Sequence, residues 1–98
     1  MKALKIEGHS VSEIEIENTL EALQKVVDGH IETIGIVPGE AVMIVNEEGR
    51  LRGMAPNPIA SAFAGIDIVG PALIVGVDED DFTDVPEDAA NALKKMFA

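Results

Sequence analysis

The segment from Ile16 to Gly53 constrains the fold most, because it joins one helix pattern to a series of short strand patterns with sharp breaks between them. Apolar residues at helical spacing predict a helix over Asn18–Asp28. Residues rich in Ile, Thr and Val then predict a strand over His30–Val37, and a continuous apolar run predicts a buried strand over Ala41–Val45. A return strand over Leu51–Met54 completes a three-stranded meander.

The breaks between these elements carry specific residue types. Asn18 is the expected N-cap of the helix, with Glu21 three residues later as in a capping box. Gly29 stands where the residue that ends a helix is usually found. Pro38-Gly39 suits a type II turn, and the stretch from Asn46 to Gly49 suits a type I turn with a bulge.

The remaining chain supplies shorter elements. Asn57 followed by Pro58 predicts the start of a short apolar helix that ends at Gly65. The C-terminal helix is expected to begin near Pro86, after an acidic stretch over Asp78–Asp88. The other expected extended segments are Ala3–Glu7, Glu13–Ile16, Ile66–Val69 and Ala72–Val77.

We therefore expect an α+β fold in a single domain over residues 1–98. It should have a small, mostly antiparallel sheet of about four to five strands, a helix in the N-terminal half, a short connecting helix and a C-terminal helix. The first and last helices should pack against the sheet. Two helices on one face would leave the other face of so apolar a sheet open, so a homodimer that buries the second face is expected.

The net charge of the chain limits the kinds of molecule that it is expected to bind. Eighteen Asp and Glu stand against seven Lys and Arg, which gives a formal net charge of −11. Direct binding to nucleic acid or to an anionic membrane surface is disfavoured, because both need clustered basic side chains. Basic protein surfaces, cations or neutral ligands suit this chain better. With neither a secretory signal nor a long apolar run, a soluble cytoplasmic protein is expected.

The sequence contains no recognisable catalytic or metal-binding motif. It has no cysteine, which excludes disulfides and thiolate chemistry. Its two histidines, His9 and His30, lack an accompanying catalytic set, although Ser10 and Ser12 follow the first closely. The acidic stretch from Asp78 does not match a calcium-binding EF-hand loop, and the glycines do not form a phosphate loop. We expect neither an enzyme nor a bound cofactor or metal.

One polar cluster is the candidate site for a ligand or a partner. It surrounds the expected return strand and concentrates amides, carboxylates and two arginines. It consists of Asn46, Glu47, Glu48, Gly49, Arg50, Arg52 and Asn57. The alternative interpretation is structural, with Asn46 as a turn residue and Asn57 as a helix cap.

Most of the chain also resembles a known family. The segments IENTLEALQKVVDGHIETIGI, NEEGRLRGMAPNPIA and DIVGPALIVG are similar to domain-of-unknown-function family 3846. The residues that match the family's first phrase are Leu20, Leu23, Gln24, Gly29, Ile31 and Glu32. Those that match the later phrases are Asn46, Glu47, Glu48, Gly49, Leu51, Asn57 and Gly70. One departure is Asp28, where the family usually has glycine, so the exit from the helix is expected to differ.

The resemblance implies a small cytoplasmic protein encoded by a phage, plasmid or other mobile element, and it brings no activity, catalytic residue or cofactor. Three functions remain open. The first is a non-enzymatic binding module that acts through a host protein or through self-association. The second is a small-ligand-binding or sequestering protein. The third is an acidic mimic of nucleic acid that inhibits a host DNA-binding protein.

Overall fold

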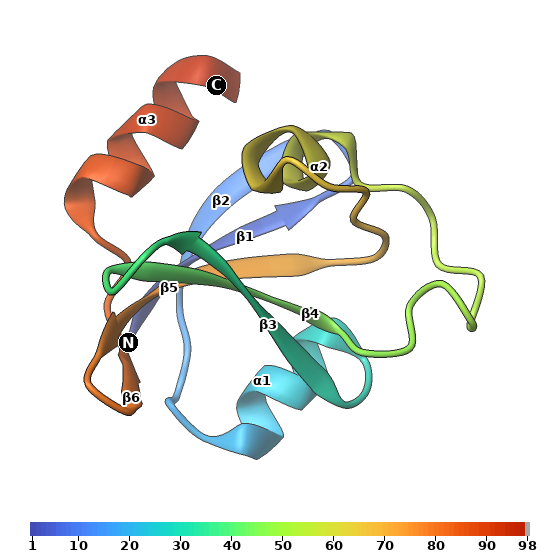
Figure 1. The fold of residues 1–98 in the computed structure, drawn as a ribbon, viewed down its shortest axis with the longest axis horizontal. Coiled ribbons are helices and arrows are strands. Elements are labelled where there is room, and N and C mark those ends of the chain that lie inside the picture. Colours follow the sequence, from blue (N-terminus) through green and yellow to red (C-terminus); the bar gives the residue numbers. More distant parts are fainter. Residues whose placement is uncertain (98) are drawn as a thin grey trace.

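The computed structural model describes residues 1–97 and has the α+β fold that the sequence predicts (Figure 1). Six antiparallel strands form one sheet, one strand more than expected, and three helices pack around it. The strands are β1 (Lys2–Glu7), β2 (Ser10–Glu15), β3 (Ile31–Val37), β4 (Ala41–Asn46), β5 (Ala72–Asp78) and β6 (Asp81–Thr83). The helices are α1 (Leu20–Val27), α2 (Pro58–Ala64) and α3 (Glu87–Phe97).

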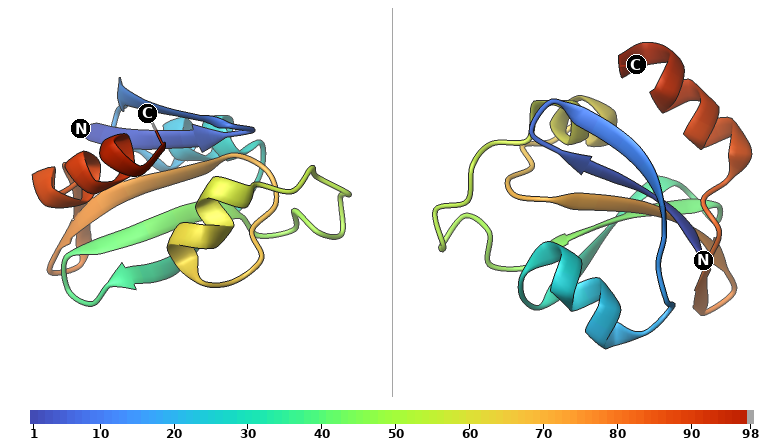
Figure 2. Two further views of the ribbon diagram at one scale, coloured as in Figure 1. Left: turned by 90° about the horizontal axis from the view of Figure 1, so that it is seen from above. Right: turned by 180° about the vertical axis from the view of Figure 1, so that it is seen from behind.

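Strand β5 is the centre of the sheet. The strand order is β2-β1-β5-β4-β3, so β5 separates β1 from β4, while β2 and β3 are the two edges (Figure 2, left). Strands β1 and β6 pair with the same side of β5. Strand β1 pairs with its first residues and β6 with its last residues. With neighbours on both sides, β5 is buried from Ala72 to Gly76, as the apolar sequence of this segment requires.

Both faces of the sheet are covered by helices of the same chain. In Figure 1, α1 lies below the sheet, and α2 and α3 lie above it. On the α1 side, Leu23 and Val27 pack with Ala3, Ile44, Leu73 and Val75. On the opposite side, α2 and α3 contribute Ile59, Ala60, Ala90 and Leu93 to a core with Leu4, Ile6, Met43 and Ile74. The expectation that the first and last helices pack on the sheet is confirmed, but they cover opposite faces.

This arrangement removes the reason for which a homodimer was expected. The expectation assumed that the first and last helices share one face and leave the other apolar face open. Because α1 covers one face and α2 and α3 cover the other, no such open face follows from the position of the helices. The dimer itself stays a prediction that needs a different argument.

The predicted return strand over Leu51–Met54 is wrong. The chain turns there instead, with Arg52 N donating to Glu48 O at 2.9 Å and Gly53 N donating to Arg50 O at 3.1 Å. Strand β4 finds its second neighbour in β5, which follows much later in the sequence. The segment Ile66–Val69 is not a strand either, since only Val69 forms an isolated bridge, with Pro56. Conversely, the acidic stretch contains the short strand β6, which the sequence did not predict.

Helix α1 begins and ends one residue away from the predicted caps. Thr19 is the N-cap, and its hydroxyl accepts from Ala22 N at 3.2 Å. Asn18 instead donates its side-chain amide to Asp81 and to the carbonyl of Phe82. At the other end the residue in the αL conformation is Asp28, with φ of 62°, and Gly29 follows it with φ of 153°.

The short helix α2 follows the prediction closely. Asn57 caps it, Pro58 occupies its first turn and Gly65 ends it with φ of 76°. None of the helices in residues 1–97 is both long enough and apolar enough to cross a bilayer.

Candidate functional site

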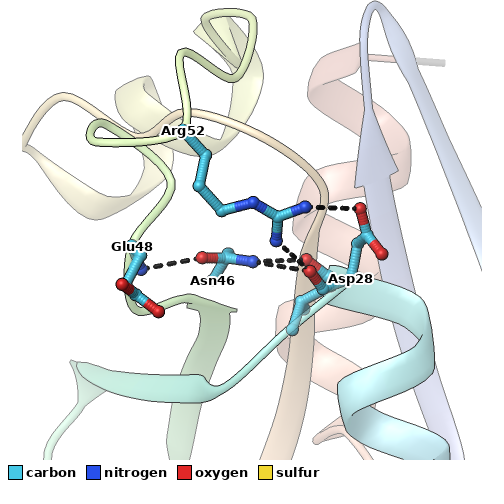
Figure 3. Close-up of polar contacts among 5 residues, drawn as sticks. Asp28, Asn46, Glu48 and Arg52 are labelled. Carbon is cyan, nitrogen blue, oxygen red and sulfur yellow. Dashed lines mark hydrogen bonds and ion pairs between the residues drawn. The ribbon is translucent and has the colours of Figure 1, made fainter.

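Asn46, the last residue of β4, joins the loop that follows β4 to the end of helix α1 (Figure 3). Its side chain is buried, with 5% exposed. Its amide nitrogen donates to the carbonyls of Val27 and Asp28, both at 3.0 Å, and its amide oxygen accepts from Glu48 N at 2.7 Å. These bonds satisfy carbonyls at the C-terminal end of the helix that have no partner within it. Both amide donors of Asn46 are therefore already used inside the protein.

Arg52 contacts the same helix end from the far side of the loop (Figure 3). Its Nη2 lies 3.0 Å from Oδ2 of Asp28, and its Nη1 donates to the carbonyl oxygen of Asp28. Both side chains remain partly in solvent, with 43% of Arg52 and 76% of Asp28 exposed. Arg52 thus holds the loop against α1.

Asn57 is a second buried amide, with 1% exposed. Its nitrogen donates to the carbonyls of Ile6 and Gly70, both at 2.9 Å. Its oxygen accepts from Ala60 N at 3.2 Å, which caps α2. The side chain therefore ties β1, α2 and the approach to β5 together, and it has no donor left over.

Five of the seven predicted site residues do line one pocket, of about 220 Å³, which we call the loop pocket. It lies between the loop after β4, strands β3 and β4, and the segment that leads from α2 to β5. Arg52 and Asn57 are outside it. The lining residues are Glu32, Ile34, Val45, Asn46, Glu47, Glu48, Gly49, Arg50, Leu51, Ile66, Asp67, Ile68 and Val69.

Gly49 brings the two walls of the loop pocket together. A Cβ atom at this position would lie 2.9 Å from Cγ2 of Val69, so only glycine allows the loop to approach Val69 this closely. Arg50 adds a polar link, since its Nη2 donates to the carbonyl of Asp67 at 3.2 Å. The loop and the segment after α2 thus lie side by side through these two contacts.

The charged side chains of the loop pocket are predominantly acidic. Its four carboxylates belong to Glu32, Glu47, Glu48 and Asp67, against the single guanidinium of Arg50, so the formal charge is −4 + 1 = −3. All five side chains are exposed. They form an anionic rim that attracts cationic groups.

The loop pocket also exposes apolar side chains. Leu51 is 87% exposed and Ile66 is 53% exposed, although both belong to residue types that are usually buried. They line the loop pocket together with the partly or fully buried Ile34, Val45 and Ile68. Sequence reasoning missed Leu51 and Ile66 as site residues because it assigned both to strands. The signal available was that Leu51 is an isolated leucine between Gly49 and Gly53.

The histidines and the nearby serine do not form a catalytic group with one another. His9 lies in the exposed turn between β1 and β2, and the nearby Ser10 hydroxyl donates to the carbonyl of Glu7. His30 is exposed just before β3, and its carbonyl accepts from Glu47 N. Within residues 1–97 no group of three or more His, Asp or Glu side chains is arranged to hold a metal ion.

A second pocket of about 390 Å³ lies beside Asn57, between Val26, Met54 and Pro71.

Comparison with known proteins identifies the family. The model of the family described as domain of unknown function (DUF3846) matches residues 1–98, so the chain belongs to this family, as the resemblance predicted. No curated protein and no solved structure matches the chain.

Proposed function

We propose that this member of the DUF3846 family is a non-enzymatic binding module whose loop pocket recognises a segment of a partner protein with both apolar and basic side chains. The observation that carries the proposal is the pairing of exposed Leu51 and Ile66 with an anionic rim. Apolar side chains that stay in water at a concave, polar-rimmed surface are characteristic of protein interaction sites.

The position of Leu51 supports this interpretation, because the loop that carries it is held in place. Arg52 contacts Asp28 on one side of the leucine, and Gly49 packs against Val69 on the other. A further bond from Met54 N to Gly49 O, at 3.0 Å, closes the loop behind it. A loop whose backbone is already held in place loses little conformational entropy when a partner covers it, which favours affinity.

The rim charge favours a basic partner over a second copy of this chain. A symmetric contact through the loop pocket would bring two rims of formal charge −3 together, on molecules that each carry −11. Like charges brought together at an interface oppose association. The homodimer predicted from the sequence would therefore have to use another surface. The family resemblance adds the expectation that the partner is a host protein met by an accessory protein of a mobile element.

The experiment is an affinity capture with three baits from a bacterial lysate. The baits are the wild-type protein, the double variant Leu51→Ser/Ile66→Ser, and the control Leu20→Ser. Leu20 is 58% exposed and lies on α1, so its variant removes an exposed apolar side chain outside the loop pocket. We expect a protein that wild type and Leu20→Ser retain, that the double variant loses, and that about 0.5 M NaCl releases. Identical capture by all three baits would refute the proposal.

A small ligand is the second candidate, because Arg50 places one guanidinium at the edge of the same concave site. A guanidinium pairs readily with a carboxylate or phosphate group. The volume of about 220 Å³ lies below the usual range of ligand pockets, roughly 300–1,000 Å³, and this ranks the ligand second. Native mass spectrometry separates the candidates: an added mass that is lost on denaturation and absent from Arg50→Ala would favour the ligand.

The nucleic-acid mimic has the least support. Such a mimic needs carboxylates spaced along one surface. Here the acidic stretch around β6 lies at the end of β5, and the loop pocket lies at the end of β4. Because β4 and β5 are antiparallel, the two groups of carboxylates are at opposite ends of the sheet (Figure 1).

A further inference from the structure

We propose that the partner segment binds as an extended strand added to the free edge of β3, with its alternate side chains directed into the loop pocket. This inference rests on the proposed function and specifies how the partner is held. Strand addition uses main-chain hydrogen bonds for affinity and pockets beside the edge for specificity. Three observations support it: the unpaired edge of β3, the position of the loop pocket beside that edge, and the charge of the rim.

Among the described residues 1–97, strand β3 pairs only with β4 and forms one edge of the sheet (Figure 2, left). The bond from Glu47 N to His30 O, at 2.9 Å, fixes which backbone groups face β4. Hydrogen-bonded and non-bonded pairs alternate in an antiparallel ladder, so Glu32 and Ile34 bond to β4. The N–H and C=O groups of Ile31 and Thr33 therefore point away from the sheet and are available to another strand.

The free edge adjoins the loop pocket directly. Glu32 and Ile34 of β3 both line it, and Ile34 packs against the core on the α2 and α3 side. Side chains of an added strand alternate between the two faces of the sheet. Those on the face of Glu32 and Ile34 would lie beside the loop pocket, within reach of its acidic rim. A partner fits this surface if every second residue, on the face toward the loop pocket, is either basic (Lys or Arg) or apolar.

The length of usable edge is short. The register of the β3–β4 ladder shifts between Gly35 and Val37, and Pro38 follows. Bulges and prolines end strand pairing. The added strand would therefore contact the stretch from Ile31 to Gly35, which limits the interaction to a short linear segment of the partner.

The opposite edge of the sheet gives a matched control. On β2, the N terminus donates to Ile16 O and Ile16 N donates to Met1 O, both at 2.9 Å. By the same alternation, Glu13 has its N–H directed outward, as Thr33 does on β3. Glu13 also pairs with Lys94 of α3 at 3.1 Å, and this edge has no part in the loop pocket.

The test selects binders from a displayed library of random dodecapeptides on the immobilised wild-type protein. Selected peptides are then measured against wild type, Thr33→Pro and Glu13→Pro. Proline removes an outward N–H without removing a bond to the neighbouring strand, so edge positions tolerate it. We expect peptides that carry basic and apolar residues two positions apart, on the one face of the added strand that meets the loop pocket. They should bind Thr33→Pro at least about tenfold more weakly than wild type and Glu13→Pro with unchanged affinity.

Hydrogen exchange on the wild-type complex keeps the test decisive if Thr33→Pro fails to fold. Bound peptide should slow exchange at the amides of Ile31 and Thr33, with little change at Glu32 and Ile34, which already bond to β4. Peptides that need Leu51 and Ile66 but leave the Ile31 and Thr33 amides unprotected would overturn strand addition and leave the proposed function intact. A library that yields no binder to wild type would overturn both.

Discussion

Arg52 and Asp28 are joined at the exit of helix α1, where the guanidinium contacts both the carboxylate, at 3.0 Å, and the backbone carbonyl of the aspartate (Figure 3). The pair links the loop after β4 to a helix that precedes it in sequence by more than 20 residues. It also fixes one side of the loop that presents Leu51.

Replacing Arg52 with Ala should loosen the loop without unfolding the protein. Because both partners are partly exposed to solvent, the pair contributes less than about 1 kcal/mol to the free energy of unfolding. Limited proteolysis should nevertheless cut the stretch from Glu47 to Met54 faster in the variant. Lys94→Ala removes another exposed ion pair, outside the loop, and should leave cleavage there unchanged. Equal cleavage of wild type and Arg52→Ala would show that the pair does not hold the loop.

Asp28 should tolerate glycine and asparagine but not a β-branched residue. Its φ of 62° lies in the left-handed region, which costs an ordinary side chain about 1–2 kcal/mol. We expect Asp28→Val to lower the free energy of unfolding by about that amount in urea titrations. Asp28→Gly should stay within about 1 kcal/mol of wild type, since relief of strain offsets the loss of the exposed ion pair. A Val variant as stable as the Gly variant would contradict the left-handed assignment.

Asn46→Ala should be strongly destabilising. The substitution removes three hydrogen bonds and leaves the buried carbonyl of Val27 without its side-chain partner, at an expected cost of about 2–4 kcal/mol. The control is Asn18→Ala, which also removes side-chain hydrogen bonds, but at an exposed position, so water replaces them at little cost. Urea unfolding of the three proteins measures both effects. Similar losses for Asn18 and Asn46 would mean that burial of the amide is not what matters.

Gly76→Ala should destabilise the centre of the sheet. A Cβ atom there would overlap the carbonyl oxygen of Asp84 and lie 3.0 Å from Cγ2 of Thr83. The backbone after β6 would have to move, at a cost of about 1–3 kcal/mol. Gly35, on the edge strand β3, is the control, because a Cβ atom there meets nothing within 4 Å. Thermal unfolding should show a clear fall in Tm for Gly76→Ala and almost none for Gly35→Ala.

The elements predicted correctly are those whose signals are local. Asn57, Pro58 and Gly65 mark the ends of α2 within the helix itself, and the structure uses each in the expected role. The error over Leu51–Met54 is different in kind. Whether that segment pairs with β4 depends on whether another strand takes the place, and β5 does so from a distant part of the sequence. The local sequence pattern cannot decide whether Leu51–Met54 or β5 is the strand that pairs with β4.

The candidate site divides in the same way. The turn from Asn46 to Gly49, which includes Glu47, was predicted from the sequence. Its residues line the loop pocket together with Arg50. The buried roles of Asn46 and Asn57 depend on carbonyls of α1, β1 and the approach to β5, which only the folded chain brings close. The exposure of Leu51 likewise follows from the absence of a strand at that position.

The central position of β5 has a consequence for synthesis of the chain on the ribosome. The β1–β2 hairpin and the α1–β3–β4 unit are translated first, but they have no contact through a shared strand until residues 72–78 leave the exit tunnel. Until then the nascent chain carries two separate half-sheets, each with an unpaired inner edge that is open to wrong pairing. Insertion of β5 closes both edges in one step, so a nascent chain whose residues 72–78 are still inside the tunnel exposes these edges to chaperones.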